Sequence, residues 1–258
     1  MSISIDKKGA IAYLTLARAD RGNAIDGEFI ARLWDACEAL AEEEDVRAVV
    51  LKADGEVFSR GWDWESLAED GADPLEAAGV AGMLDDPFGC LAEMPKPVVC
   101  AINGDATGGG LALALACDVR VAAEEAMFSL PETSMGLVPM GGATQRLVRL
   151  VGRGKATEMV LTGDAIDAAE ALRCGLVGSV VSSTEVFAEA EKIAARIAER
   201  GPLAVQYAKE AVGRGLDMPL EQALRYETDL TMILQTTEDR AEGVKAFLKK
   251  RAPKFKGR

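Results

Sequence analysis

Four glycines stand in the segment NGDATGGGLALALACD, residues 103–118, between an apolar run and a stretch of small apolar residues. Gly108, Gly109 and Gly110 are consecutive, and glycine lets a backbone approach a ligand closely. N–H groups at the start of a helix lack an intrahelical acceptor, so such a segment can bind an anion or an oxygen on which negative charge develops. The spacing of these glycines fits neither the phosphate-loop pattern nor the G-x-G-x-x-G dinucleotide pattern. A tight structural turn is the alternative interpretation.

Two further segments could complete a reactive site. FSRGWDW, residues 58–64, turns on Gly61, so the backbone N–H of Trp62 could be a second donor. A pair of N–H donors is what the stabilisation of an enolate requires. In FSLPETSMGLVPMGGATQRL, residues 128–147, Pro131 fixes the chain before Glu132, and the neighbourhood is largely apolar. Desolvation there would raise the pKa of the Glu132 carboxyl toward the range useful for acid–base catalysis, whereas an exposed capping glutamate is the alternative.

The absence of histidine narrows the possible chemistry. It excludes Ser-His and Cys-His nucleophiles and histidine-based metal sites. The five cysteines show no C-x-x-C pairing, so neither a disulfide framework nor a zinc knuckle is indicated. No flavin, nicotinamide or metal motif stands out, and we expect no cofactor. Proton transfer must therefore use carboxylates, Tyr, Lys, Cys or water.

The net charge of −13 argues against a nucleic-acid partner, because nucleic acid rewards basic surfaces. Residues 245–258 carry seven positive charges and no acid, so the rest of the chain carries −20. This segment is either a solvated tail or a clamp for a polyanion such as a nucleotide phosphate. No apolar stretch is long enough to cross a bilayer, and the N-terminus has no run of signal-peptide type. We therefore expect a cytoplasmic protein with no membrane partner.

Hydrophobic patterns place the three segments in an α/β layer structure. Residues 2–6 and 10–16 alternate apolar and polar, which predicts a hairpin. Asp26 is a candidate N-cap, and apolar residues at a spacing of three to four predict a helix from there through Glu44. Strands are expected at 46–52, 98–102 and 119–123, and the second of these should be buried on both faces.

The remaining segments show less regular or purely helical patterns. Between Phe58 and Pro97 scattered Gly, Asp and Pro predict helical pieces joined by a mobile loop that could shape a pocket. After the short apolar segment LVGSVV only helices are expected, at 184–200, 202–213, 219–236 and 239–250. The pattern does not decide whether these helices pack on their own core or against another subunit.

Together these residues resemble the crotonase, or enoyl-CoA hydratase/isomerase, superfamily over nearly the whole chain. The similar segments follow one another in the family's order and at comparable spacing. They are DRGNAID (20–26), FSRGWD, PKPVVCAINGDATGGGLALALACDVRVAAEEAMFSLPE, GLVPMGGATQRLVRLVG, LTGDAIDAAEALRCGLVGSVV and EGVKAFLKKRAPKFKG. A chance coincidence of six ordered segments is very improbable.

The resemblance implies a fold and a quaternary structure. The fold would be a crotonase-like spiral of β-β-α repeats over residues 1–200, which binds acyl-CoA. Residues 201–258 would form a C-terminal helical oligomerisation region that builds a trimer, often paired into a hexamer. The substrate would be an acyl-CoA thioester, so coenzyme A arrives as part of the substrate.

The resemblance also implies roles for individual residues. The N–H groups of Trp62 and Gly109 would form the oxyanion hole, and Glu132 would transfer protons. Substrate contacts would come from Arg21, Ala24, Asp63, Gly108, Gly110, Phe247 and Lys250. In many members of the family, the residues at the positions of Phe247 and Lys250 reach coenzyme A across a subunit boundary.

One position departs from the family's hydratases, which use two glutamates to hold and activate a water molecule. Ala112 stands at the first position, and only Glu132 is present at the second. A general acid or base contributes on the order of 10²–10⁴ in rate, so loss of one should cripple ordinary hydration. A single carboxylate suffices to shift a double bond, and the sequence slightly favours a Δ3,Δ2-enoyl-CoA isomerase over a hydratase. Asp63, Glu65 and Asp105 lie nearby in sequence, but the motif assigns none of them the missing role.

Other outcomes stay open at this point. The superfamily also contains decarboxylases, dehydratases, ring-forming and ring-opening enzymes and thioester hydrolases, while members that need a catalytic histidine are excluded by composition. The alternative to an enzyme is a catalytically silent acyl-CoA-binding protein, because the first of the two glutamates is absent. The acyl group depends on residues 65–96 and on how Trp62, Met135 and Met140 fill the pocket.

Overall fold

A computed structural model describes residues 2–65 and 86–258 of the chain. The N-terminal hairpin joins β1 (Ile3–Lys8) and β2 (Ile11–Leu16), which pair antiparallel from Ile3 opposite Leu16 to Lys8 opposite Ile11. Gly9 makes the turn with φ +62°, a conformation that favours glycine. The predicted hairpin is thus confirmed.

Five of the six strands in the main sheet run parallel to one another, and β1 is the antiparallel edge strand. The order is β1-β2-β3-β4-β6-β9, with consecutive neighbours hydrogen-bonded. The strands added to the hairpin are β3 (Ala48–Ala53), β4 (Val98–Ile102), β6 (Val119–Ala123) and β9 (Ser179–Val181). Every residue of β4 is buried, as its continuous apolar sequence predicts.

A second sheet has three short strands in the order β5-β7-β8. They are β5 (Ala106–Thr107), β7 (Met127–Ser129) and β8 (Ile166–Asp167). The chain passes from β4 through β5 into α5 (Gly109–Leu115), and again from β6 through β7 toward α6 (Ala143–Thr162), which is kinked at Gly152. Each such β-β-α turn gives one strand to each sheet, as expected for the spiral of β-β-α repeats that the resemblance implies.

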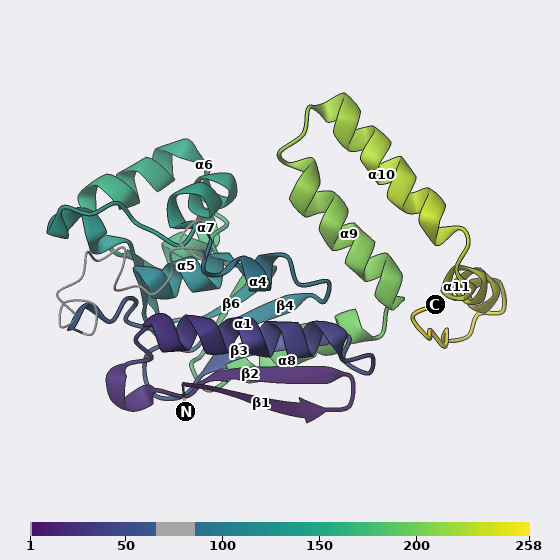
Figure 1. Cartoon of the computed structure of the whole chain (residues 1–258), viewed down its shortest axis with the longest axis horizontal. Helices are drawn as coiled ribbons and strands as arrows, with labels where there is room; N and C mark the ends of the chain where they lie inside the picture. Colours follow the sequence, from purple (N-terminus) through teal and green to yellow (C-terminus); the bar gives the residue numbers. More distant parts are fainter. Residues whose placement is uncertain (1, 66–85) are drawn as a thin grey trace.

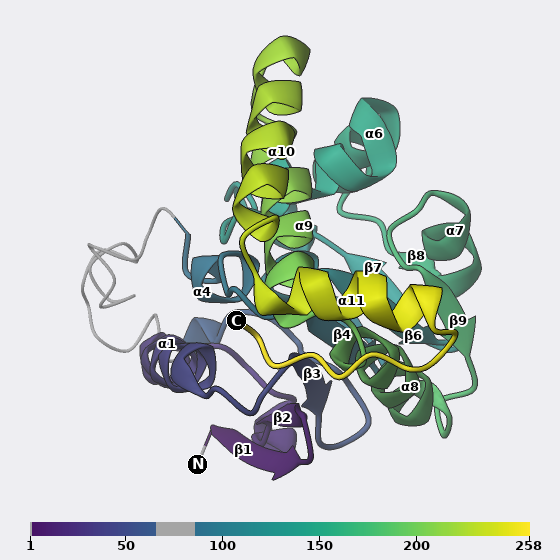
Figure 2. The same cartoon turned by 90° about the vertical axis from the view of Figure 1, so that its right-hand side faces the viewer.

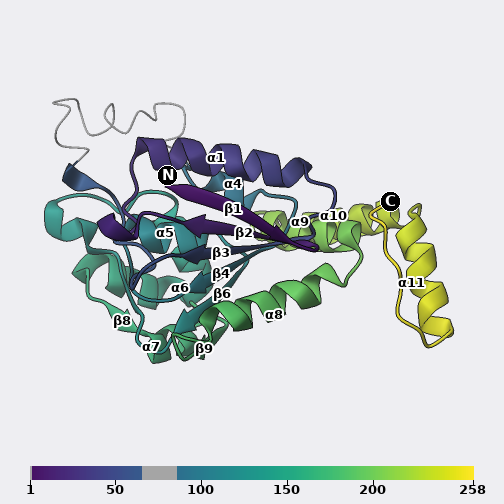
Figure 3. The same cartoon turned by 90° about the horizontal axis from the view of Figure 1, so that it is seen from below.

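Two helices cover the main sheet from opposite sides (Figure 3). On one face lies α1 (Gly27–Glu42), whose first turn is capped where Asp26 Oδ1 accepts a hydrogen bond from Phe29 N at 2.8 Å. On the other face lies α8 (Val186–Ala198), which packs on β3, β4 and β6. The apolar core is enclosed between these helices and the sheet. Asp26 and the helix that follows it are confirmed as predicted.

Short elements connect the layers. They are the 3₁₀ turn η1 (Ala19–Arg21), α4 (Gly89–Ala92), the 3₁₀ turn η2 (Pro131–Met135) and α7 (Ala168–Arg173). Of the helical pieces predicted between Phe58 and Pro97, α4 lies in the described part. Residues 66–85, and with them most of the predicted mobile loop, lie outside the described residues.

Three helices follow the core and extend away from it (Figure 1). They are α9 (Pro202–Gly215), α10 (Leu220–Leu234) and α11 (Glu238–Leu248). The α9 and α10 helices pack against each other, and α11 lies at the far end of the molecule (Figures 1 and 3). In the two described ranges, no helix is long and apolar enough to cross a membrane. The division at residue 200 falls between α8 and α9 and stays a prediction.

Candidate active site

The loop after β3 and the glycine segment after β4 meet through backbone pairing. Thr107 N donates to Ser59 O at 3.0 Å, and an isolated parallel bridge joins Ser59 to Ala106. On its other side the loop pairs with Ile25, which donates to Gly61 O at 2.8 Å and accepts from Asp63 N at 2.8 Å. The backbone of Trp62 is therefore held in place on both sides.

Gly61 allows the two segments to come this close. A methyl group placed on its Cα would lie 2.5 Å from the carbonyl oxygen of Thr107 and 3.0 Å from the backbone nitrogen of Gly109. The residue also has φ +87°, which favours glycine. Within the described ranges neither the N–H of Trp62 nor that of Gly109 finds a hydrogen-bond acceptor. Two free donors therefore lie close together, as an oxyanion hole requires.

Glu132 is buried beside these donors. The residue is only 1% exposed, and in the described part of the chain neither carboxyl oxygen has a hydrogen-bond partner. Burial raises the pKa of the Glu132 carboxyl, and its own nearby backbone N–H offsets this only in part. A methyl group on Gly108 would lie 2.8 Å from Oε1. The carboxyl thus lies against the residue that precedes Gly109, whose N–H is one of the two free donors.

The other two glycines have structural reasons to be glycine. The N–H of Gly108 donates to Ser129 O at 2.9 Å, and its φ is +53°. A methyl group on Gly110 would lie 2.5 Å from Ser59 O, so Gly110 permits the loop to pack on α5. Their proposed substrate contacts stay predictions, because no ligand is present to test them.

In the described part of the chain, the position of the missing first glutamate lies beside apolar groups. Ala112 is fully buried on α5. A methyl group on Gly141 would lie 2.7 Å from the ring of Phe88 and 3.3 Å from the methyl carbon of Ala112. The two nearby aspartates have other partners, since Asp105 Oδ1 accepts from Met127 N and Asp63 pairs with arginine. Neither therefore supplies a second free carboxylate at Ala112.

The Trp62 side chain forms one wall of this site. Its indole stacks on Phe88 with ring centroids 5.9 Å apart and planes at 21°. A methyl group on Gly109 would lie 2.8 Å from Cε2 of the indole, so glycine is needed there as well. Sequence reasoning missed Phe88 and Gly141, and the only signal was an aromatic residue after Pro87 in a segment expected to be mobile.

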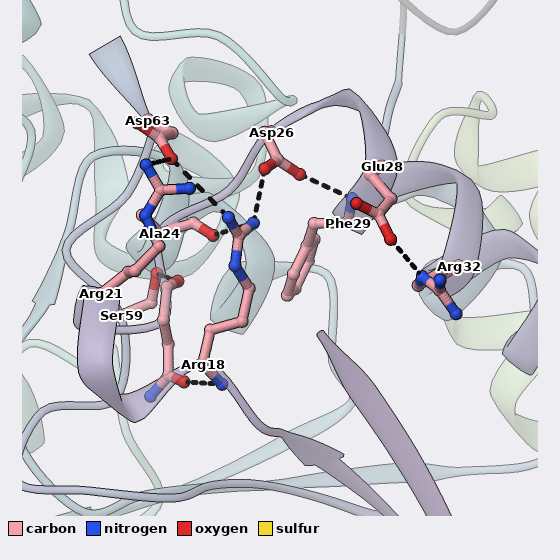
Figure 4. A network of polar contacts seen from close by, with 10 residues as sticks. Arg18, Arg21, Ala24, Asp26, Glu28, Phe29, Arg32, Ser59 and Asp63 are labelled. Atoms are coloured by element: carbon pink, nitrogen blue, oxygen red, sulfur yellow. Dashed lines mark hydrogen bonds and ion pairs between the residues drawn. The ribbon is translucent and has the colours of Figure 1, made fainter. Parts of the chain in front are cut away.

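The residues predicted to contact coenzyme A near the N-terminus do come together (Figure 4). Asp63 is 6% exposed, and its Oδ2 lies 3.2 Å from Arg21 Nη2 and 3.8 Å from Arg18 Nη2. Arg18 Nη1 also donates to Asp26 Oδ2 at 2.6 Å and to Ala24 O at 3.2 Å. Arg18 was not predicted as a site residue, because its role depends on two acids brought together by folding.

Replacement of Arg18 by methionine tests this network. Arg18 and Asp26 are each 14% exposed. The Arg18→Met variant therefore removes a guanidinium that pairs with two shielded carboxylates, those of Asp26 and Asp63. We expect the free energy of unfolding to fall by about 2 kcal/mol, measured by urea titration. The control is Arg32→Met, which breaks an exposed pair with Glu28 and should cost only about 0.3–0.5 kcal/mol. Equal losses in both variants would contradict a shielded network.

The two predicted C-terminal contacts lie far from Glu132 in the same chain. Phe247 is on α11 and is 83% exposed, and Lys250 follows that helix with φ +50°. Figures 1 and 3 place α11 and α5 at opposite parts of the molecule. Within one chain, therefore, Phe247 and Lys250 do not join the site.

The basic C-terminal segment is partly fixed to the rest of the chain. Arg251 forms a two-pronged pair with Glu242 at 2.6 and 2.8 Å. The segment then runs back beside α11 (Figure 2), where the carbonyl of Phe255 accepts a hydrogen bond from Arg47 and the backbone of Gly257 donates to Asp239. It is therefore not a freely solvated tail over its whole length.

A large open depression lies elsewhere, between α6 and α9. It has a volume of about 910 Å³, and Asp118, Arg146, Arg149 and Lys209 are among the residues that line it. Lys209 pairs with Asp118 at 2.8 Å, and Asp118 also accepts a hydrogen bond from Val98 N. Asp118 thus has a structural role, since it ties α9 to the start of β4. Neither Glu132 nor Trp62 lines this depression, and we assign the chemistry to the glycine segment.

Known proteins match this chain along its full length. A family model described as enoyl-CoA hydratase/isomerase matches residues 6–258. The 2,3-dehydroadipyl-CoA hydratase of Escherichia coli (strain K12) is 37% identical, with 98% of each chain covered. The (E)-benzylidenesuccinyl-CoA hydratase of Thauera aromatica is 39% identical, with 100% of each chain covered. The crystal structure of an enoyl-CoA hydratase from Bacillus anthracis has a TM-score of 0.94 at 36% identity, with 100% of each chain covered. These matches confirm the resemblance and the fold class predicted from the sequence.

Proposed function

The chain belongs to the enoyl-CoA hydratase/isomerase family and is an enzyme, and we propose that it adds water to the C2=C3 double bond of a 2-enoyl-CoA thioester. One observation carries the proposal. A buried carboxyl without a partner among the described residues, Glu132, lies beside two unpaired N–H donors, those of Trp62 and Gly109. Both relatives compared above, and the similar crystal structure, are named hydratases, which supports water addition over the isomerisation that the sequence slightly favoured.

The site residues divide the reaction between them. The thioester oxygen accepts hydrogen bonds from the N–H groups of Trp62 and Gly109, which stabilise the enolate by about 2.7–4 kcal/mol each in comparable oxyanion holes. Glu132 takes a proton from water as the water oxygen bonds to C3 and the π electrons move toward the thioester oxygen. Glu132 then returns that proton to C2, so one carboxyl serves as base and then as acid.

Isomerisation of a 3-enoyl-CoA is the second candidate, and Ala112 favours it. The apolar surroundings of Ala112 supply no second carboxylate from Asp63 or Asp105. In this reaction Glu132 removes a proton from C2, the same donors hold the enolate, and Glu132 returns the proton to C4. Both candidates share the enolate and the single carboxyl, and they differ in whether water reacts.

Two substrates separate these functions. The protein is incubated with crotonyl-CoA and with a 3-enoyl-CoA while the absorbance of the conjugated enoyl thioester is followed. A hydratase lowers the absorbance of crotonyl-CoA, and an isomerase raises the absorbance from the 3-enoyl substrate. Loss of crotonyl-CoA would support our proposal, whereas turnover of the 3-enoyl substrate alone would contradict it. Binding without turnover of either would favour the silent acyl-CoA-binding protein.

We further propose that the enzyme works as a homotrimer, or as a hexamer of two trimers, in which α11 of one copy reaches the site of another. Several large apolar side chains of the C-terminal helices are exposed in the single chain, which supports burial against other copies. They are Val212, Leu216, Leu220, Leu224, Met232, Phe247 and Leu248. Sedimentation velocity should show a trimer or hexamer, and a monomer would contradict the proposal.

Phe247 offers a test of coenzyme A binding. If its ring contacts the CoA moiety, the Phe247→Ala variant should raise KM about tenfold and leave kcat close to that of the wild type, because Phe247 lies away from the reacting carbons. Steady-state kinetics with crotonyl-CoA measure both constants. Leu248→Ala is the matched control, since Leu248 is the next residue and 74% exposed. A fall in kcat with unchanged KM would count against this contact.

Other expectations from the sequence stay proposals. We propose a cytoplasmic location, no nucleic-acid or membrane partner and no cofactor beyond the coenzyme A of the substrate. The acidic net charge of −13 supports the absence of a nucleic-acid partner. In the described ranges no three His, Cys, Asp or Glu side chains are grouped so that they could hold a metal ion.

A further inference from the structure

The indole N–H of Trp62 is a buried donor that lacks an acceptor in the part of the chain that the structure describes. Leaving a buried donor unpaired is unfavourable, and such groups in native proteins call for an explanation such as a water or a ligand. The ring cannot easily turn the N–H elsewhere, because it is stacked on Phe88 and packed against Gly109. The donor is therefore fixed where a small partner could meet it.

This donor and the carboxyl of Glu132 lie against two neighbouring residues of the glycine segment, Gly109 and Gly108. A methyl group on Gly109 would lie 3.1 Å from Nε1 of Trp62, and one on Gly108 would lie 2.8 Å from Oε1 of Glu132. One group can only donate and the ionised other can only accept. A water molecule both accepts and donates hydrogen bonds, so it can accept from the indole N–H and donate to the carboxylate.

We propose that the Trp62 side chain and Glu132 together hold the water that adds to the 2-enoyl thioester. Trp62 thereby positions this water in place of the carboxylate that is absent at Ala112. One lone pair of the water accepts from the indole N–H, and the other forms the bond to C3. One O–H proton passes to Glu132, which later gives it to C2, so the indole keeps its own proton. This inference rests on the proposed hydration.

The Trp62→Phe variant removes the N–H and keeps a ring that can stack on Phe88. We expect kcat for crotonyl-CoA hydration to fall at least tenfold with little change in KM. Exchange of an α-proton of butyryl-CoA with solvent deuterium needs the enolate but no added water, so it should fall much less. The ratio of the hydration rate to the exchange rate is thus the readout of water positioning.

Trp34→Phe is the matched control, because it removes an indole N–H that is paired, at 3.0 Å, with Pro87 O. It should leave the ratio unchanged. If Trp62→Phe lowers hydration and exchange by the same factor, or lowers neither, the inference is overturned while the hydratase function stands. If the wild-type enzyme exchanges the α-proton but does not hydrate crotonyl-CoA, the proposed function and this inference both fail.

A second measurement leaves Trp62 intact. The 3-hydroxyl of the product takes the place of the water, so the indole N–H should donate to it. In ¹⁵N-labelled Glu132→Gln protein, where turnover is blocked, the Trp62 indole signal should move downfield with 3-hydroxybutyryl-CoA and stay near its free position with butyryl-CoA. The same shift with both ligands, or with neither, would overturn the inference.

Discussion

The Glu132→Gln variant should lose about 10²–10⁴ of the catalytic rate, whichever enoyl-CoA the enzyme prefers. The amide cannot accept and return a proton at neutral pH, and neither Asp63 nor Asp105 supplies a second free acid at Ala112. The enolate donors are backbone groups and stay in place, so binding of the thioester should be kept. Steady-state kinetics and direct titration with a saturated acyl-CoA measure the two effects separately. Tight binding with a lost rate is the expected combination.

The same substitution should make the protein more stable at pH 8. Burial raises the pKa of Glu132 above its ordinary value of 4.5, so the stability of the wild type falls as pH rises from that value through the raised pKa. A neutral glutamine avoids this loss, and its advantage should shrink below about pH 4.5. Thermal unfolding at several pH values measures the difference. Glu125→Gln, at an exposed position, is the control, and equal shifts in both variants would contradict the burial argument.

The Gly61→Ala variant should lower kcat by about 10²–10³, the loss found when one oxyanion donor is removed. The added methyl group would lie 2.5 Å from Thr107 O and 3.0 Å from Gly109 N, so the two segments must move apart. These segments carry the N–H groups of Trp62 and Gly109. Once the segments move apart, the two N–H groups can no longer both donate to one thioester oxygen. The rate of turnover should fall more than the affinity for the thioester.

Gly9→Ala is the control for the strain of a positive φ. Gly9 has φ +62° and lies in the turn between β1 and β2. Among the described residues, no atom beyond its two chain neighbours lies within 4 Å of the added methyl group. It should lose some stability and keep its activity. If Gly61→Ala loses no more activity than Gly9→Ala, the close approach of the two segments does not build the oxyanion hole.

Much of the fold could be predicted because local patterns determine it. The hairpin of β1 and β2, the capping by Asp26 and the continuous apolar run of β4 each express a local preference that the tertiary structure keeps. The three segments of the site could be found for a related reason. Gly61, Gly108 and Glu132 are unusual choices for their local context, and the structure shows that two of them prevent collisions.

The rest depended on contacts between segments that are distant in sequence. Arg18 stands out only once folding brings Asp26 and Asp63 to it, and Phe88 only once it stacks on Trp62. The choice between isomerase and hydratase was limited in the same way. Counting glutamates favoured the isomerase, and the buried indole N–H of Trp62, which carries the proposed water site, is not visible as a motif.

One measurement tests the central claim, that Glu132 moves the proton at the carbon next to the thioester, independently of which enoyl-CoA is the substrate. Butyryl-CoA is incubated with the enzyme in deuterium oxide, and loss of the α-proton signal is followed by NMR. We predict exchange with the wild type and a rate at least 10²-fold lower with Glu132→Gln. Exchange at an undiminished rate in the variant would contradict the claim.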